Sequence, residues 1–218
     1  MTGHLSVEHA LTGLHSAIGQ YYTQKVQTHG PTPLGVDWPC RPTQELRFVQ
    51  LLRLCDFSMP FSLNDVGCGY GAMLAFLAKR HRRREISYLG LDLSAAMIAQ
   101  AQQLWHKRRN AVFVVANKSP RTADYSIASG IFNVKLDLSD ALWTEFVAET
   151  LAAMRLTSRR GFAVNFLAPL SEGASLKPEL YRIPSTFWSA YCEREFSAKV
   201  EVLDNYGMRE YTLLVRTS

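Results

Sequence analysis

Hydrophobic and polar positions follow two different periods along this chain. Short apolar runs predict buried strands at residues 61–66, 86–91, 111–115, 124–129, 161–167, 200–203 and 210–216. Apolar residues three and four positions apart predict helices at 7–28, 44–55, 141–156 and 185–196, and two further helices begin after Gly71 and Ser94. Strands and helices alternate from residue 61 onward, which predicts an α/β fold with a parallel sheet. The last two strands flank a turn at 204–207 and predict an antiparallel hairpin.

The stretch DVGCGYG, at residues 65–71, joins the first predicted strand to a helix. Its three glycines allow positive φ angles and let a ligand come close to the backbone. The helix that follows presents free N–H groups and a partial positive charge to an anionic group. The turn alone is also compatible with a nicotinamide or flavin site, or with a purely structural turn. Its G-x-G-x-G spacing, however, differs from the G-x-G-x-x-G of dinucleotide enzymes.

An acidic residue ends the second predicted strand. Asp92 follows the apolar run 86–91, and Ser94 is placed to cap the next helix. A carboxylate at this position, roughly 20 residues or more beyond the glycines, is suited to bind the two hydroxyls of a ribose. The strand, turn, helix and acid together predict the nucleoside-binding half of a doubly wound sheet.

The motifs DVGCGYG, YLGLDLS and ADYSIASGIF, in this order, resemble those of the class I S-adenosylmethionine-dependent methyltransferases. The resemblance runs from about residue 61 to the C-terminus. It implies a Rossmann-like α/β fold, with a doubly wound, mostly parallel seven-stranded sheet that ends in an antiparallel hairpin. It further implies a single domain over 1–218, in which an N-terminal helical cover (1–58) closes over a core (59–218). A nicotinamide enzyme would usually end in a parallel strand instead of a hairpin.

The resemblance also implies the cofactor, S-adenosylmethionine, and its product, S-adenosylhomocysteine. The acid and glycines of the first motif would hold the methionine end, Asp92 the ribose, and Leu93 the adenine. Asn117 stands where the family often has an acid, and its side-chain oxygen could accept a hydrogen bond from the adenine amine. The residues expected to bind the cofactor are Tyr22, Thr32, Trp38, Asp65, Gly67, Cys68, Gly69, Gly71, Asp92, Leu93, Met97, Asn117, Ser129 and Gly130.

The acceptor side is expected beside the third motif, around residues 129–133. We expect Phe132 to line the acceptor pocket and Asn133 to orient the acceptor, with core packing and a turn as the respective alternatives. The aperiodic segment 170–184 is interpreted as a lid or as an ordinary surface loop. The expected substrate-binding residues are Tyr21, Arg47, Phe132, Asn165, Tyr181 and Arg182, and the expected catalytic residues are His29, Glu45 and Asn133. Asp37 is a further candidate base, and His29 ranks first because its pKa suits proton transfer near neutrality.

The composition limits the kinds of partner that the protein is expected to bind. The net charge is +5 and the pI about 9.1, but the cations cluster at 79–84 and 107–109, where two predicted helices end. Cations there complement the helix dipole at the sheet edge opposite a ligand crevice, so we expect no nucleic-acid partner. The four cysteines show no metal-binding spacing, which predicts no metal and a reduced, cytoplasmic protein. No apolar run approaches the length of a membrane span, and no secretory signal is expected.

The function favoured by these observations is methyl transfer from S-adenosylmethionine to an oxygen or nitrogen atom of a small molecule. The acceptor could be a secondary metabolite, a sugar or an amine, and the protein a monomer or homodimer. Two alternatives stay open: an RNA-modifying methyltransferase, motivated by the pI, and a non-catalytic nucleoside-binding subunit. The intact glycine turn and Asp92 argue against the second alternative.

Overall fold

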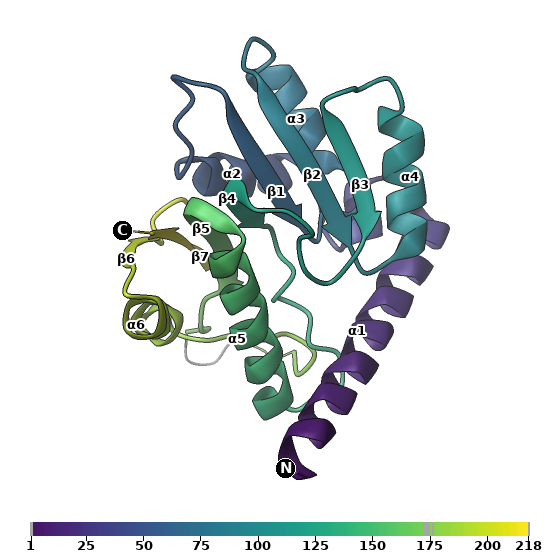
Figure 1. Cartoon of the computed structure of the whole chain (residues 1–218). Coiled ribbons are helices and arrows are strands. Elements are labelled where there is room, and N and C mark those ends of the chain that lie inside the picture. Colours follow the sequence, from purple (N-terminus) through teal and green to yellow (C-terminus); the bar gives the residue numbers. More distant parts are fainter. Residues whose placement is uncertain (1, 172–174, 176, 218) are drawn as a thin grey trace.

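A computed structural model describes residues 2–171, 175 and 177–217, with the backbone alone for residues 2–9. Its centre is a seven-stranded sheet of order β3-β2-β1-β4-β5-β7-β6 (Figure 1). Strands β1 to β5 pair in parallel, whereas β7 is antiparallel to both β5 and β6. This confirms the predicted mostly parallel sheet with a terminal hairpin. The strands are β1 (Phe61–Val66), β2 (Ile86–Asp92), β3 (Ala111–Val115), β4 (Ala123–Ala128), β5 (Ser158–Leu167), β6 (Lys199–Leu203) and β7 (Glu210–Arg216).

Three helical segments precede the first strand, and four helices connect the later ones. The first three are α1 (Thr2–His29), the 3-10 helix η1 (Pro33–Val36) and α2 (Arg41–Leu52). The others are α3 (Ala72–Arg80), α4 (Ala95–Trp105), α5 (Asp140–Leu156) and α6 (Ser185–Phe196). The sequence pattern predicted the start of α2 at residue 44. The helix begins earlier because Cys40 takes the cap position and Pro42 lies in the first turn, where its missing N–H costs nothing.

Each face of the sheet has its own hydrophobic core. One cluster joins α5 and α6 to the sheet and includes Leu14 and Ile18 of α1. The other joins α2, α3 and α4 to the opposite face, with Leu51, Phe76 and Ile98 among its members. In Figure 1, α5 and α6 lie in front of the sheet while α2 and α3 lie behind it. The doubly wound arrangement follows from these two apolar faces, because a parallel sheet must be covered on both sides.

The connection between β3 and β4 has no helix of its own. Residues 116–122 cross the sheet as an irregular segment, fixed by the Arg121 guanidinium, which donates to Asn64 Oδ1 (3.1 Å), Leu63 O (3.0 Å) and Ser87 O (2.8 Å). α1 packs against both α4 and α5 beside this connection. The N-terminal helix therefore runs past the carboxyl ends of the strands, where a ligand crevice is expected (Figure 1).

The predicted lid at 170–184 includes residues 172–174 and 176, which lie outside the described residues. Its later part is tied to the core by two isolated β-bridges, Val134 with Leu180 and Leu167 with Arg182. The N–H of Tyr181 also donates to the carbonyl of Asn133 at 3.0 Å. Residues 180–182 are thus anchored beside the exits of β4 and β5.

Candidate active site

A cavity with an empty volume of about 960 Å³, including the space at its open mouth, lies at the carboxyl ends of β1, β2 and β4. The strand ends and the glycine turn form its base. The side opposite is formed by α1, η1 and α2, which contribute His15, Tyr22, Val36, Gln44 and Phe48. The cavity is therefore enclosed between the sheet and the N-terminal segment.

The glycine turn folds back onto the end of β2. The N–H groups of Gly67 and Cys68 donate to the carbonyl of Leu91 at 2.8 and 3.0 Å. Gly67 and Gly69 have φ angles of 70° and 53°, which side chains disfavour. A Cβ at Gly69 would lie 3.0 Å from Val36 Cγ1, and one at Gly67 would overlap Ile131 Cγ2. The two glycines let the turn present bare backbone to the cavity while the cover lies close above it.

Asp92 fixes this turn from the neighbouring strand. Its Oδ2 accepts a hydrogen bond from Gly69 N at 2.9 Å, and its Oδ1 accepts one from Ser94 N at 2.8 Å. Each oxygen retains a lone pair for a ligand hydroxyl. Burial raises the pKa of Asp92, while the N–H groups of Ser94, Gly69 and Leu93 oppose that shift. Asp92 thus connects the glycine turn to the start of α4 and lines the cavity.

A second carboxyl group, Asp65, lies at the base of the cavity and is almost fully buried. Burial raises its pKa to about 7, with Asp92 adding to the rise, while the hydrogen bond from the Tyr88 hydroxyl opposes it. Among the described lining residues no Lys or Arg is present to neutralise these acids. The cavity therefore favours a ligand that carries positive charge.

His15 and Asn117 meet where the cavity passes between α1 and the β3–β4 connection. Asn117 Nδ2 lies 3.5 Å from His15 Nδ1, and the His15 ring packs edge-on against Phe146. Burial lowers the pKa of His15, with Glu149 raising it and Lys118 lowering it. A neutral imidazole can accept from the Asn117 amide nitrogen, which leaves the amide oxygen available for a ligand amine.

The segment after α1 is anchored by a polar cluster. The Asp37 carboxylate pairs with Lys25 at 2.6 Å and accepts from the Tyr21 hydroxyl at 2.8 Å. The next residue, Trp38, lines the cavity and packs directly on Gly130, whose φ is 78°. Tyr22 also lines the cavity, and burial raises the pKa of its hydroxyl, with Asp37 and Asp92 adding to that effect.

Most of the residues expected to bind a cofactor line this one cavity. They are Tyr22, Trp38, Asp65, Gly67, Cys68, Gly69, Asp92, Leu93, Met97, Asn117, Ser129 and Gly130. The exceptions are Thr32 and Gly71. Thr32 is exposed and donates to His29 O, whereas Gly71 lies beneath the Trp105 indole, where it starts α3 with φ 86°.

The expected catalytic residues lie outside the set that lines the cavity. His29 is exposed at the end of α1, and Glu45 is half-buried on α2. Asn133 is buried, and its amide has no hydrogen-bond partner among the described residues. Asp37 lies outside the set as well, because it anchors Lys25 and Tyr21. None of these four is positioned by the structure as a base that faces the cavity.

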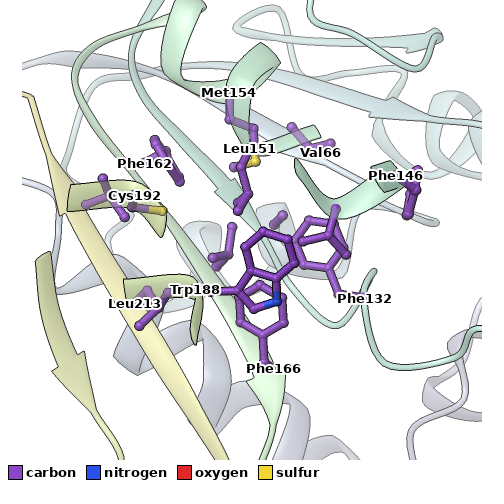
Figure 2. Packing of buried hydrophobic residues seen from close by; sticks show 14 of the residues in the cluster. Val66, Phe132, Phe146, Leu151, Met154, Phe162, Phe166, Trp188, Cys192 and Leu213 are labelled. Atoms are coloured by element: carbon purple, nitrogen blue, oxygen red, sulfur yellow. The ribbon is translucent and has the colours of Figure 1, made fainter. Parts of the chain in front are cut away.

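The expected substrate-binding residues are also absent from the lining set, and each has a structural partner instead. Phe132 stacks on Phe166 at a centroid separation of 5.1 Å, and Figure 2 shows both rings with Trp188 inside the core. The positive φ of Gly130 precedes the turn that sends Phe132 away from the cavity. The remaining five have polar partners: Tyr21 with Asp37, Arg47 and Asn165 with Glu210, Tyr181 with Thr144, and Arg182 with the carbonyl of Ala168.

Several lining residues were not predicted from the sequence. They are His15, Ile18, Val36, Gln44, Phe48, Val66, Tyr70, Ala72, Met73, Ala116, Phe146 and Thr150. Two of them, Val66 and Tyr70, lie inside the motif DVGCGYG, so they would have been found if every residue of that motif had been expected to line the cavity. His15 and Phe48 carry no such signal, because the packing of α1 and α2 alone brings them to the cavity. Ile131 also lines the cavity, and it lies in the stretch 129–133 that was expected on the acceptor side.

The described part of the chain holds no group of three His, Cys, Asp or Glu side chains arranged to bind a metal ion. None of the helices in that part combines the length and apolarity that crossing a bilayer requires. The four cysteines are free thiols, of which Cys40 is exposed and the others are buried.

Comparisons with known proteins agree with this geometry. A family model described as "Methyltransferase domain" matches residues 64–156. Rv1506c of Mycobacterium tuberculosis, which its name assigns provisionally to the methyltransferases, is 39% identical over 165 residues, or 76% of this chain and 98% of that protein.

Solved structures share the fold at low sequence identity. Magnesium protoporphyrin IX methyltransferase (ChlM) from Synechocystis PCC 6803, with bound SAH, has a TM-score of 0.60 at 15% identity, covering 81% of this chain and 82% of that one. A SAM-dependent methyltransferase from Aquifex aeolicus has a TM-score of 0.59 at 15% identity, covering 90% and 98% respectively. Both likenesses concern the fold.

Proposed function

This chain belongs to the class I S-adenosylmethionine-dependent methyltransferases, and from that premise we propose that it methylates an oxygen or nitrogen atom of a small molecule. We further propose that residues 1–58 cover a core formed by residues 59–218 within one domain. The observation that carries the proposal is the acidic cavity at the strand ends, closed from above by α1, η1 and α2.

The residues of the cavity fit S-adenosylmethionine. When bound, this cofactor supplies an electrophilic methyl group on a positively charged sulfur. Asp92, together with Asp65 in its ionised form, gives the cavity a negative character that suits both the sulfonium and the ammonium of the cofactor. Asp92 has free lone pairs for the ribose hydroxyls, and the glycine turn leaves its backbone accessible. Asn117, with its amide nitrogen directed to His15, offers its oxygen to the adenine amine.

The enclosure of the cavity favours an acceptor of small size. The cofactor would occupy the part between the glycine turn, Asp92 and Asn117. What is left for an acceptor lies near Trp38, Gly130 and Ile131, beneath the N-terminal segment. An enclosed space of this kind suits a metabolite better than a folded RNA or a protein surface. The basic run 79–84 supports the same view, because it covers the last two residues of α3 and the turn before β2, at the opposite edge of the sheet.

The chain contributes positioning and the exclusion of water to the reaction. Near Trp38, Gly130 and Ile131, none of the named wall residues carries a group that titrates near neutrality. We therefore propose that alignment supplies most of the acceleration, an effect that reaches about 7–11 kcal/mol in the best intramolecular systems. A neutral amine, or a hydroxyl acidic enough to ionise by itself, is the acceptor that needs no side-chain base.

We also propose a cytoplasmic location and a monomeric or homodimeric state. Free thiols at all four cysteines suit a reducing compartment, and three of them are buried within the fold.

The test is a transfer assay with S-adenosylmethionine labelled in its methyl group. The purified chain is incubated with total RNA, with a protein fraction and with a low-molecular-mass metabolite fraction from the same cells, in parallel with Asp92→Ala. Label should enter only the metabolite fraction, and Asp92→Ala should incorporate much less label than the wild-type chain. Label in RNA, at a rate that falls steeply with salt, would overturn the small-molecule assignment in favour of an RNA substrate.

A further inference from the structure

Trp38 forms a wall of the cavity beside the exit of β4. Its indole lies so close to Gly130 that a Cβ on this glycine would overlap Cζ2 of the ring. Residues 129–131 line the same part of the cavity. The indole belongs to the connection between η1 and α2, so its place depends on whatever holds that connection against the sheet.

Arg47 of α2 holds the other side of the indole. Its guanidinium carbon lies 3.4 Å from the centroid of the Trp38 ring, a stacked cation–π contact. The same guanidinium pairs with Glu210, because Nε and Nη2 both donate to Oε2, at 2.7 and 2.6 Å. Only 4% of Arg47 and 2% of Glu210 are exposed. The pair joins the N-terminal segment to the first residue of β7.

Asn165 of β5 connects the same carboxylate to the other half of the wall. Its Nδ2 donates to Glu210 Oε2 at 3.4 Å, and its Oδ1 accepts from Gly130 N at 2.8 Å. Trp38 and Gly130, which touch each other, are thus both tied to Glu210, one through Arg47 and one through Asn165. Arg47, Asn165 and Glu210 are all absent from the lining of the cavity.

Fold stability alone is a poor reason for this arrangement. Taking both charges of an ion pair out of water costs free energy that their attraction often fails to recover, so a hydrophobic pair would commonly be as stable. The cost is increased here because Arg47 Nη1 and Glu210 Oε1 are buried without a hydrogen-bond partner among the described residues. The ion pair instead fixes the orientation of the Arg47 side chain. A planar, forked guanidinium can be oriented by a carboxylate and stack on an indole at the same time.

We propose that Arg47, Asn165 and Glu210 are positioning residues that hold Trp38 and Gly130 together as the wall of the cavity where the cofactor and the acceptor meet. The three act through Trp38 and Gly130 and touch neither cofactor nor acceptor. The assignment of this wall to the cofactor and the acceptor rests on the proposed function, but the positioning of Trp38 by Arg47 is independent of it and can be measured without any ligand.

The first measurement is the quenching of tryptophan fluorescence by acrylamide. The Trp38 contribution is obtained by subtracting the signal of Trp38→Phe from that of the protein that retains Trp38. Of the other three tryptophans, Trp143 and Trp188 are 0% exposed, whereas Trp105 on α4 is partly exposed. The signal of Trp105 is present in both proteins, so the subtraction removes it. Arg47→Lys keeps the charge but loses the fork and the stacking, so it should make Trp38 easier to quench. Glu210→Gln, which keeps the shape, should do the same and serves if Arg47→Lys fails to fold.

The second measurement is a double-mutant cycle on the affinity for S-adenosylhomocysteine, determined by calorimetry. Arg47→Lys should weaken binding by about 3- to 30-fold in the wild-type background, which lies within the range of about 2- to 150-fold that corresponds to the coupling between residues in contact. The same substitution should have no further effect in a Trp38→Leu background. Arg53→Lys is the matched control, because Arg53 forms an exposed ion pair with Glu201 at 3.7 Å, and it should change neither readout.

Equal losses of affinity in both backgrounds, or unchanged quenching of Trp38 in Arg47→Lys and Glu210→Gln, would overturn the positioning role. If the wild-type protein fails to bind S-adenosylhomocysteine, the proposed function fails, whereas the quenching experiment still decides whether Arg47 positions Trp38.

Discussion

Replacing Asp92 with alanine tests the link between the glycine turn and the ligand. The change removes the acceptors of two backbone N–H groups, those of Gly69 and Ser94, at 2.9 and 2.8 Å. A hydrogen bond to a charged acceptor contributes about 1.5–3 kcal/mol, and some water can replace this half-buried carboxylate, so we expect unfolding to become easier by about 2–4 kcal/mol. For a chain of this size that corresponds to a melting temperature lower by about 5–10 °C.

The same substitution should also weaken the binding of S-adenosylhomocysteine. Losing the carboxylate leaves ribose hydroxyls without partners, at a cost of about 1–3 kcal/mol, or about 5- to 150-fold in affinity. Thermal unfolding and calorimetric titration of the same preparation separate the two effects. Titrations are performed well below the melting temperature of the variant.

Asp124→Ala is the matched control for this experiment. The Asp124 carboxylate accepts from Ser62 N and Ser62 Oγ, at 2.7 and 2.6 Å, but it lies at the start of β4, away from the cavity. It should therefore lower the melting temperature and leave the affinity for S-adenosylhomocysteine unchanged. If Asp92→Ala behaves in the same way as Asp124→Ala, the ribose contact assigned to Asp92 is refuted.

Three further predictions concern other parts of the site. Gly130→Ala should weaken the binding of S-adenosylhomocysteine and lower the melting temperature. A side chain at a φ of 78° costs about 1–3 kcal/mol, and the new methyl group would displace Trp38. An unaltered titration would mean that Trp38 can move aside freely. Burial raises the pKa of Asp65 from 3.8 to about 7, so the folded state keeps a proton that the unfolded state loses, and the free energy of unfolding should fall as pH rises between these values. Denaturant titrations at several pH values should show that the free energy of unfolding falls less with pH in Asp65→Asn than in the wild-type protein. An equal dependence on pH in both proteins would contradict a buried carboxyl group with a raised pKa. His29→Ala should keep the wild-type affinity and methyl-transfer rate, because the side chain is exposed outside the cavity, and a large loss of turnover would restore it as a base.

The cofactor side of the cavity could be predicted from sequence because its determinants are local. A strand, a glycine turn and a helix follow one another at residues 61–80, and the acid that ends β2 is fixed by the parallel pairing of β1 with β2. Carboxyl ends of adjacent parallel strands must meet at one sheet edge. The motif residues and Asp92 are therefore brought together by topology alone.

The acceptor side depends on contacts between distant parts of the chain. Arg47 was expected to bind the substrate, but its side chain pairs with Glu210, which is 163 positions away. Phe132 follows Gly130 by only two residues, yet the turn between them directs its ring into the core against Phe166. Neither the Arg47–Glu210 pair nor the position of Phe132 can be predicted from the neighbouring sequence, because both depend on which surfaces α2 and β5 bury.

The N-terminal segment shows the same limit. Its helical period correctly predicted a long first helix, and α1 spans Thr2–His29. The period could not tell that α1 would pack between α4 and α5 and bring His15 and Tyr22 to the cavity. The stretch between α1 and α2 contains η1, and Asp37 holds it against α1 through Lys25 and Tyr21. These contacts explain how a stretch rich in glycine and proline forms an ordered side of the cavity.

Cofactor binding by the acidic cavity is tested most directly by a calorimetric titration of the wild-type chain with S-adenosylhomocysteine. We expect one site per chain with a dissociation constant of about 1 μM or tighter, equivalent to at least about 8 kcal/mol of binding free energy. A correctly folded protein that releases or absorbs no binding heat over a range of temperatures would contradict the assignment of the acidic cavity to this cofactor.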